Sequence, residues 1–190
     1  MTINSTTRTL DDGRGAVTVD DLFDTDIDDL WQACTSPDRL ARWVAEVSGD
    51  LRVGGTVTAL FTSTADTTGR IEVCDAPHHL LVVMEPGSTT ERTEVEAWLT
   101  TEGSRTRLVI EERGLPADSL HFYTAGWQTH LEDLATSLSS KDVIHPGGWS
   151  AERPSAHWHQ RWTELLPAHR SVQQREPGVG QQIGDQGEEA

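Results

Sequence analysis

The feature that most constrains the fold is a long amphipathic segment late in the chain. Gly114-Leu115-Pro116 precedes it, and it runs to about Lys141, which corresponds to a helix of roughly 25 residues and about 37 Å. Its mostly apolar residues recur at helical spacing and share roughly a third of the circumference: Leu120, Tyr123, Trp127, His130, Leu131, Leu134 and Leu138. Only a sizeable sheet could cover a stripe of that length.

Short strands separated by turn residues occupy most of the chain before this helix. Alternating apolar and polar residues predict a first strand from Ala16 to Phe23, and helical spacing then predicts two short helices as far as Trp43. From Val47 to Ile110, further strand patterns are broken by glycine or proline about every ten residues. This order predicts an α+β fold in which a curved antiparallel sheet of about six or seven strands wraps around the long C-terminal helix.

The two ends of the chain differ in composition from this central part. Residues 1–14 are polar and rich in threonine, so we expect a flexible leader before a domain over residues 15–141. Residues 142–170 hold a Pro-Gly linker and a shorter amphipathic helix, which we expect to pack on the domain. From 171 to 190 the chain is mostly Gln, Gly and acidic residues, a composition that favours a disordered tail.

Charge and cysteine content exclude several classes of protein. The net charge is −16 at pH 7, with 31 acidic against 15 basic residues, so phosphate backbones and anionic membranes should repel this acidic protein. Neither nucleic acid nor a membrane is expected as a partner. Cys34 and Cys74 give no disulfide framework or zinc site. The N-terminus shows no signal-peptide pattern, and we expect a cytoplasmic protein.

Short motifs narrow the fold further. Leu30-Trp31 and Ser36-Pro37-Asp38-Arg39-Leu40 lie in the predicted helix pair, and others follow in order: Val53-Gly54-Gly55, Gly69-Arg70-Ile71, Pro77-His78-His79-Leu80, Thr106-Arg107-Leu108 and Ala125-Gly126-Trp127. Together they resemble the AHSA-type branch of the SRPBCC, or START-like (birch-pollen-allergen-like), superfamily, a branch named for activators of a heat-shock chaperone ATPase. The resemblance implies a helix-grip fold, with a cavity between sheet and last helix that often receives apolar small molecules.

The resemblance leaves the activity open, because the superfamily includes lipid carriers, hormone receptors, polyketide aromatases and cyclases, and chaperone activators. Our first interpretation is binding of a small apolar molecule, of unknown identity, in this cavity. A second is an enzyme of the polyketide cyclase or hydratase kind, using His130 and Tyr123 as acid–base groups. A third is a protein-interaction or co-chaperone-like module. No cofactor is expected under any of them.

The predicted ligand-binding residues project from the inward faces of these elements. Tyr123 and His130 share a stripe with apolar residues, so a hydroxyl and an imidazole would point into an apolar pocket. The full set is Trp43, Phe61, Met84, Tyr123, Trp127, His130 and Leu134. The competing interpretation is ordinary packing, with the polar groups hydrogen-bonded to backbone.

Trp98 interrupts the alternation, because its neighbours on the same face of the strand are polar. We expect the C-terminal extension to cover it through Trp158 or Trp162, from a helix over about 154–166 that Pro167 should end. Alternatively, Trp98 or the extension contacts a protein partner, and a homodimer is one form this contact could take.

Motifs for metal or nucleotide chemistry are missing from the sequence. His157 and His159 are two positions apart and would point to different faces of a helix, so no metal site is predicted. There is no nucleophile elbow and no phosphate-binding glycine loop. Cys34 lies among apolar residues, which indicates core packing and not a nucleophile.

Overall fold

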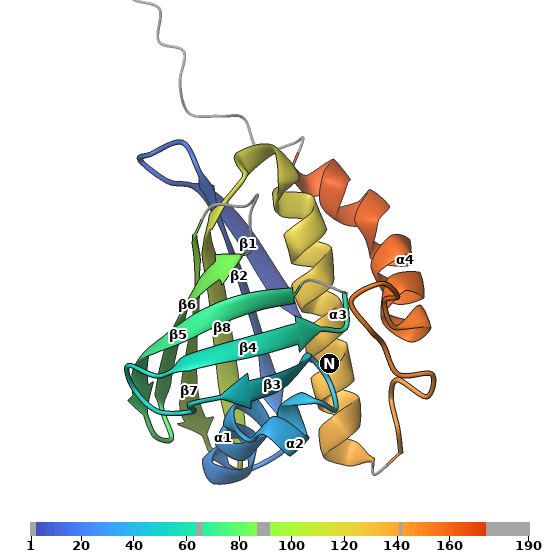
Figure 1. The fold of residues 1–190 in the computed structure, drawn as a ribbon. Coiled ribbons are helices and arrows are strands. Elements are labelled where there is room, and N and C mark those ends of the chain that lie inside the picture. The colour runs from blue at the N-terminus through green and yellow to red at the C-terminus, as the bar shows by residue number, and fades with distance from the viewer. Residues whose placement is uncertain (1–2, 64–65, 87–91, 141, 174–190) are drawn as a thin grey trace, which may run out of the picture.

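The computed structural model describes residues 3–63, 66–86, 92–140 and 142–173 (Figure 1). A curved sheet lies on one side of the long helix α3, and helix α4 packs along its other side. No described helix is long and apolar enough to cross a membrane. In chain order the elements are β1 (Asn4–Thr9), β2 (Gly15–Phe23), α1 (Ile27–Thr35), α2 (Pro37–Leu40), β3 (Ala45–Gly49), β4 (Thr56–Phe61), β5 (Asp66–Asp75), β6 (His79–Pro86), β7 (Thr93–Glu102), β8 (Arg105–Leu115), the 3₁₀ turn η1 (Ala117–Ser119), α3 (Leu120–Ser139) and α4 (Ala156–Gln173).

The sheet has eight strands in the order β1-β2-β8-β7-β6-β5-β4-β3, and every neighbouring pair is antiparallel. The helix-grip fold expected from the sequence is therefore confirmed, with one strand more than predicted. That strand is β1, which pairs with β2 from Asn4↔Asp20 to Thr9↔Gly15. The expectation of a flexible leader is wrong for residues 4–9. Most residues of β1 are exposed, so backbone hydrogen bonds hold the strand and no apolar alternation marks it in the sequence.

The core lies between the inner face of the sheet and α3. Leu131 and Leu134 of α3 are fully buried and belong to one apolar cluster with Val17 of β2 and Leu108 of β8. Burying each leucine contributes about 2 kcal/mol. This packing holds α3 against the sheet along the stripe that the sequence predicted.

Helices α1 and α2 close one end of the core. The Asp26 carboxylate caps α1 by accepting a hydrogen bond from the Asp29 backbone N–H at 2.8 Å, and Pro37 occupies the first turn of α2. Trp43 follows α2 and donates from its indole Nε1 to the Ala33 carbonyl at 3.0 Å. The indole therefore fixes the helix pair against the core.

Trp158 and Trp162 of the C-terminal extension pack against α3 and not on Trp98, so the expectation that one of them covers Trp98 is wrong. Trp98 lies in β7 and stacks on the His79 ring of β6, with ring centroids 5.6 Å apart. The extension instead places Trp158 against the end of the core, where it is 6% exposed. The physical reason is that the Trp158 ring gains apolar contacts beside α3, whereas the outer face of the sheet carries ion pairs.

Helix α4 continues through Pro167 to Gln173, beyond the end that the proline predicted. A proline removes one backbone hydrogen-bond donor from a helix. In α4, contacts made by residues before and after Pro167 hold the helix together. Leu165 is buried, and His169 Nε2 lies 2.8 Å from the Gln128 side-chain oxygen of α3. Of the tail predicted to be disordered over 171–190, residues 171–173 belong to α4, and the rest lies outside the described residues.

Candidate ligand-binding cavity

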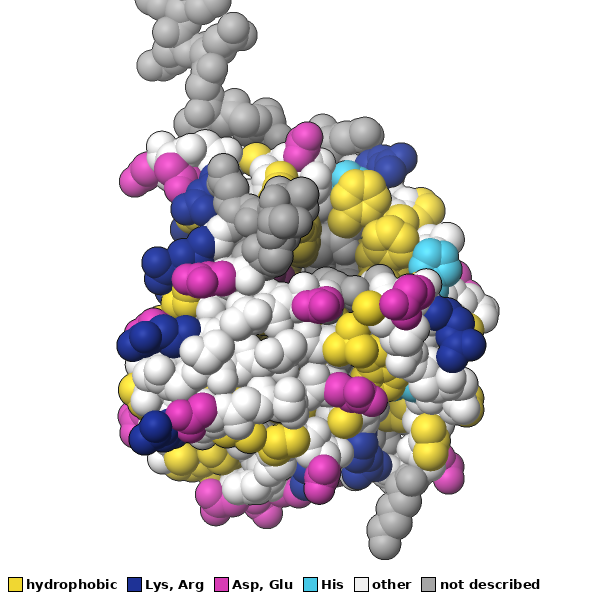
Figure 2. All heavy atoms as spheres, in the orientation of Figure 1, with side chains coloured by type: hydrophobic (Ala, Val, Ile, Leu, Met, Phe, Trp, Pro, Cys, Tyr) yellow, Lys and Arg dark blue, Asp and Glu magenta, His cyan; other side chains and the backbone are white. Residues whose placement is uncertain are grey.

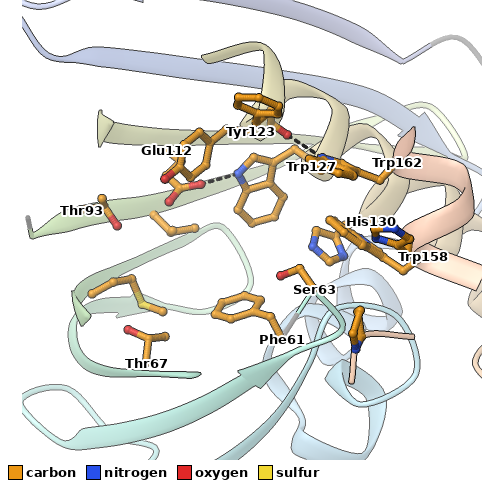
Figure 3. Close-up of a pocket in the computed structure, with 16 residues that line it drawn as sticks. Phe61, Ser63, Thr67, Thr93, Glu112, Tyr123, Trp127, His130, Trp158 and Trp162 are labelled. Carbon is orange, nitrogen blue, oxygen red and sulfur yellow. Dashed lines mark hydrogen bonds between the residues drawn. The ribbon is translucent and has the colours of Figure 1, made fainter. Parts of the chain in front are cut away.

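A cavity of about 550 Å³ lies between the inner face of the sheet, α3 and the C-terminal extension (Figure 3). Aromatic and polar side chains both contribute to its walls. The aromatic residues are Phe61, Phe122, Tyr123, Trp127, Trp158 and Trp162, and the polar or titratable ones are Ser63, Thr67, Thr93, Glu112, His130 and His159. This size and mixture are typical of small-molecule sites.

Strand register and helical spacing bring these residues together. On the sheet, Met84 pairs with Thr93, and Val95 with Glu112, so lining residues lie next to one another on adjacent strands. On α3, the lining residues Tyr123, Gly126, Trp127 and His130 recur at the spacing of one helix face. The sheet and α3 therefore form two facing walls.

Extension residues form a third wall, which the sequence did not predict. Pro154, Trp158, His159 and Trp162 line the cavity. The signal that could have indicated them is the aromatic face of the predicted C-terminal helix. Figure 2 shows hydrophobic side chains gathered over α4 and the neighbouring part of α3, beside a hollow in the surface.

The structure brings together most of the residues predicted to bind a ligand. Those that line the cavity are Phe61, Met84, Tyr123, Trp127 and His130. Trp43 and Leu134 instead lie in the core and do not line it. Leu134 is one turn beyond His130, where the apolar side chains of the closed end fill the space.

His130 is buried among aromatic rings and is held by one backbone contact. Its Nδ1 lies 3.3 Å from the Trp43 carbonyl oxygen, and since a carbonyl only accepts, Nδ1 carries the proton. Burial lowers the pKa of His130 to about 4. The ring is therefore neutral at pH 7, with Nε2 as its proton-accepting nitrogen.

Glu112 is an acidic residue of the cavity wall that sequence reasoning missed. Its Oε2 accepts a hydrogen bond from Trp127 Nε1 at 2.7 Å (Figure 3), and the Thr93 hydroxyl also bonds to its carboxyl group. Burial raises the pKa of Glu112 to about 7, although both hydrogen bonds oppose that rise. The signal was present in the sequence, because Glu112 is two residues after the inward Ile110 and so shares its face of the strand.

The charge of Glu112 influences the Tyr123 hydroxyl. Tyr123 is half-buried, and burial raises the pKa of its hydroxyl, with a smaller contribution from the Glu112 charge. The hydroxyl is therefore neutral at pH 7 and can donate a hydrogen bond to a molecule in the cavity.

A second polar cluster lies between α3 and the extension. Asp133 Oδ1 lies 3.0 Å from His157 Nε2 and Asp133 Oδ2 lies 3.3 Å from His145 Nε2, while His145 Nδ1 lies 2.7 Å from Ser155 Oγ. The residue types match those of a hydrolase triad, but Ser155 is 1% exposed and precedes α4, where its hydroxyl also accepts from the Trp158 backbone N–H. We interpret this cluster as the anchor of the extension. Over the described ranges, no group of His, Cys, Asp or Glu residues is arranged to hold a metal ion.

Comparison with known proteins places this geometry in a family. The sequence pattern of the family described as "Activator of Hsp90 ATPase homolog 1-like protein" matches residues 24–139. None of the curated proteins matches the chain.

Solved structures with this fold extend the comparison beyond the family pattern. The crystal structure of CalU16 from Micromonospora echinospora has a TM-score of 0.71 at 24% identity, over 92% of this chain and 99% of that one. DynU16, described as a protein in the dynemicin biosynthetic locus, has a TM-score of 0.63 at 22% identity, over 67% of this chain and 48% of that one. PFC0360w, an HSP90 activator from Plasmodium falciparum, has a TM-score of 0.54 at 20% identity, over 65% of this chain and 96% of that one. Because residues 1–139 make up less than three quarters of the chain, the CalU16 match includes part of the extension.

Proposed function

We propose that this chain, which belongs to the family of Activator of Hsp90 ATPase homolog 1-like proteins, binds a small apolar molecule in the cavity between the sheet and α3. The observation that carries the proposal is the aromatic cavity of about 550 Å³. Sites of about 300 to 1,000 Å³ with apolar walls and a few polar groups are those that small ligands occupy.

The walls suit a ligand with a large apolar surface and a few polar atoms. Phe61, Trp127 and Trp158 surround His130, with ring centroids 5.5 to 6.5 Å from its ring. Stacked or edge-on contact with such rings stabilises a planar apolar guest by about 0.5 to 1.5 kcal/mol per ring pair beyond area burial. Tyr123 and Glu112 can then fix its orientation by hydrogen bonds.

Filling the cavity is expected to weaken binding. Val95 of β7 lines the cavity, and the substitution Val95→Trp puts an indole into it. We expect the affinity for the neutral fluorescent probe N-phenyl-1-naphthylamine to fall by at least about tenfold, a loss of about 1.4 kcal/mol. The control is Val109→Trp on β8, whose position alternates with the inward Leu108 and Ile110 and so faces away from the cavity. Fluorescence titration should show little change for the control, and equal losses in both variants would contradict the proposal.

Native mass spectrometry tests whether a natural ligand is present. Protein purified from cells is expected to carry a small molecule that leaves on denaturation, and Val95→Trp is expected to lack it. Wild-type protein that carries no such molecule and binds no probe would overturn the proposal.

A second candidate function is acid–base catalysis in the same cavity, favoured by the presence of both Tyr123 and His130 in its walls. The neutral imidazole offers Nε2 as a base, and the Tyr123 hydroxyl offers a proton. Under this candidate, His130→Gln purified from the same cells should carry a different compound from wild type, the unconverted substrate. Identical compounds in both proteins, identified by mass spectrometry, would argue for binding without turnover.

A further inference from the structure

We infer that the molecule bound in this cavity carries a protonated amine on an apolar, ring-bearing body, and that Glu112 is the residue that recognises the amine. The inference rests on the proposed function and deepens it, because it names the chemical class of the ligand. It comes from the charges in and around the cavity.

Among the residues that the structure describes, the hydrogen-bond partners of the Glu112 carboxyl group are both neutral. Trp127 Nε1 donates to Oε2 at 2.7 Å, and the Thr93 hydroxyl is the other partner. Neutral donors orient a carboxylate without balancing its charge, and an unbalanced charge in an apolar site is costly. A cation brought by the ligand would supply that balance.

Among the described residues that line the cavity, none is a lysine or an arginine. Arg113 directly follows Glu112 in β8, but strand alternation points it to the opposite face of the sheet. There it pairs with Glu94 at 2.7 Å and also with Glu96 and Glu111. The cation nearest to Glu112 in sequence is therefore already engaged outside the cavity.

The remaining walls also favour a cation over an anion. Tyr123, Trp127 and Trp158 present aromatic rings, whose faces attract ammonium groups electrostatically. The net charge of −16 raises the local concentration of cations around the whole protein. A fatty acid or another carboxylate would meet Glu112 with no positive partner and should be excluded.

A series of three naphthalene probes with a common ring tests this preference. Naphthalen-1-ylmethylamine is cationic, naphthalen-1-ylmethanol is neutral, and naphthalene-1-acetate is anionic. At pH 8 we expect the amine to bind at least about tenfold more tightly than the alcohol, and the acetate to bind most weakly. Isothermal titration calorimetry on the full chain measures all three.

The substitution Glu112→Gln assigns the preference to this side chain. Glutamine keeps an oxygen that can accept from Trp127 and loses the charge. We expect the variant to lose at least about tenfold in affinity for the amine and less than about threefold for the alcohol. The matched control is Glu111→Gln, one residue earlier on the outer face, which should leave the order of the three probes unchanged.

The affinity for the amine should also depend on pH. A primary amine stays protonated up to pH 8, so the pH dependence reports the cavity groups. With a pKa of about 7, Glu112 is largely ionised at pH 8 and largely protonated at pH 6, which predicts about a tenfold loss of amine affinity on acidification. The other titratable groups among the described lining residues are Tyr123 and His130 of α3 and His159 of α4. The variant His159→Gln, measured in parallel, removes the exposed histidine of α4 and shows whether the pH dependence requires it.

The outcomes separate this inference from the function on which it rests. If the three probes bind equally and Glu112→Gln changes none of them, the cavity binds apolar molecules and the inference about charge is wrong. Tighter binding of the acetate than of the amine would also overturn the inference. If no probe binds wild-type protein, the proposed function itself fails.

Discussion

Replacing Glu112 with glutamine is expected to stabilise the folded protein above pH 7, by up to about 3 kcal/mol, and to leave its stability near pH 4 unchanged. Burial raises the pKa of Glu112 from 4.5 to about 7 in the folded protein. The protonated carboxyl is therefore the form that the fold tolerates. The protonated Glu112 carboxyl makes its full contribution to the free energy of unfolding below pH 4.5. That contribution declines as Glu112 ionises in the unfolded chain, and it is lost once the pH passes about 7. Glutamine resembles the protonated carboxyl at every pH.

Urea denaturation of wild type and variant between pH 4 and pH 8 measures this difference. Glu111→Gln is the matched control, because Arg8 and Arg113 on the outer face help to hold the pKa of Glu111 below its usual value. A lowered pKa stabilises the fold above pH 4.5, so the control should destabilise the protein at neutral pH, with the opposite sign to Glu112→Gln. A Glu112→Gln effect that is the same at pH 4 and pH 8 would contradict the account of this cavity.

Replacing Trp158 with alanine is expected to destabilise the protein by about 3 to 5 kcal/mol, the range for a buried large aromatic side chain. Trp158 is 6% exposed, its ring stacks on Trp162 at 5.7 Å, and it lies 5.5 Å from His130. The same variant removes part of the cavity wall, so the affinity for N-phenyl-1-naphthylamine should fall as well.

The control for Trp158 is Trp98→Ala, which removes a side chain of the same type from the outer face of the sheet. Trp98 contacts His79 by stacking and is only partly buried, so its loss should cost less than about 2 kcal/mol and leave probe binding unchanged. No described residue accepts a hydrogen bond from the buried Trp158 Nε1, so Trp158→Phe should cost much less than Trp158→Ala. Equal destabilisation by Trp98→Ala and Trp158→Ala in urea unfolding would contradict the larger contribution expected from the buried Trp158.

Local patterns predicted the elements well wherever one face of an element is buried. The stripe from Leu120 to Leu138 and the alternation of Val57, Ala59 and Phe61 both correspond to elements in the structure. Strand β1 escaped prediction because its side chains are mostly exposed and its stability comes from backbone pairing. Backbone pairing depends on a partner strand, and the residues of β1 do not indicate which strand that is.

The candidate site was predicted only in part, for a related reason. Alternation and helical spacing identify which residues point inward, as they did for Phe61, Tyr123 and His130. They do not distinguish an inward residue that meets other side chains, such as Trp43 or Leu134, from one that meets open space. Glu112 was overlooked because an acidic residue on a strand is usually assigned to the solvent face.

The sequence by itself determined the order of the elements and the face that each one buries, because helical and strand periodicity are local properties of the chain. Only the tertiary structure decided where the sheet and α3 stand apart to leave a cavity, and that Glu112 and Trp127 meet in its wall. It also decided that Trp158 and Trp162 pack beside α3 and not on Trp98. These features depend on distances between segments far apart in the chain. Such distances result from the packing of the whole molecule.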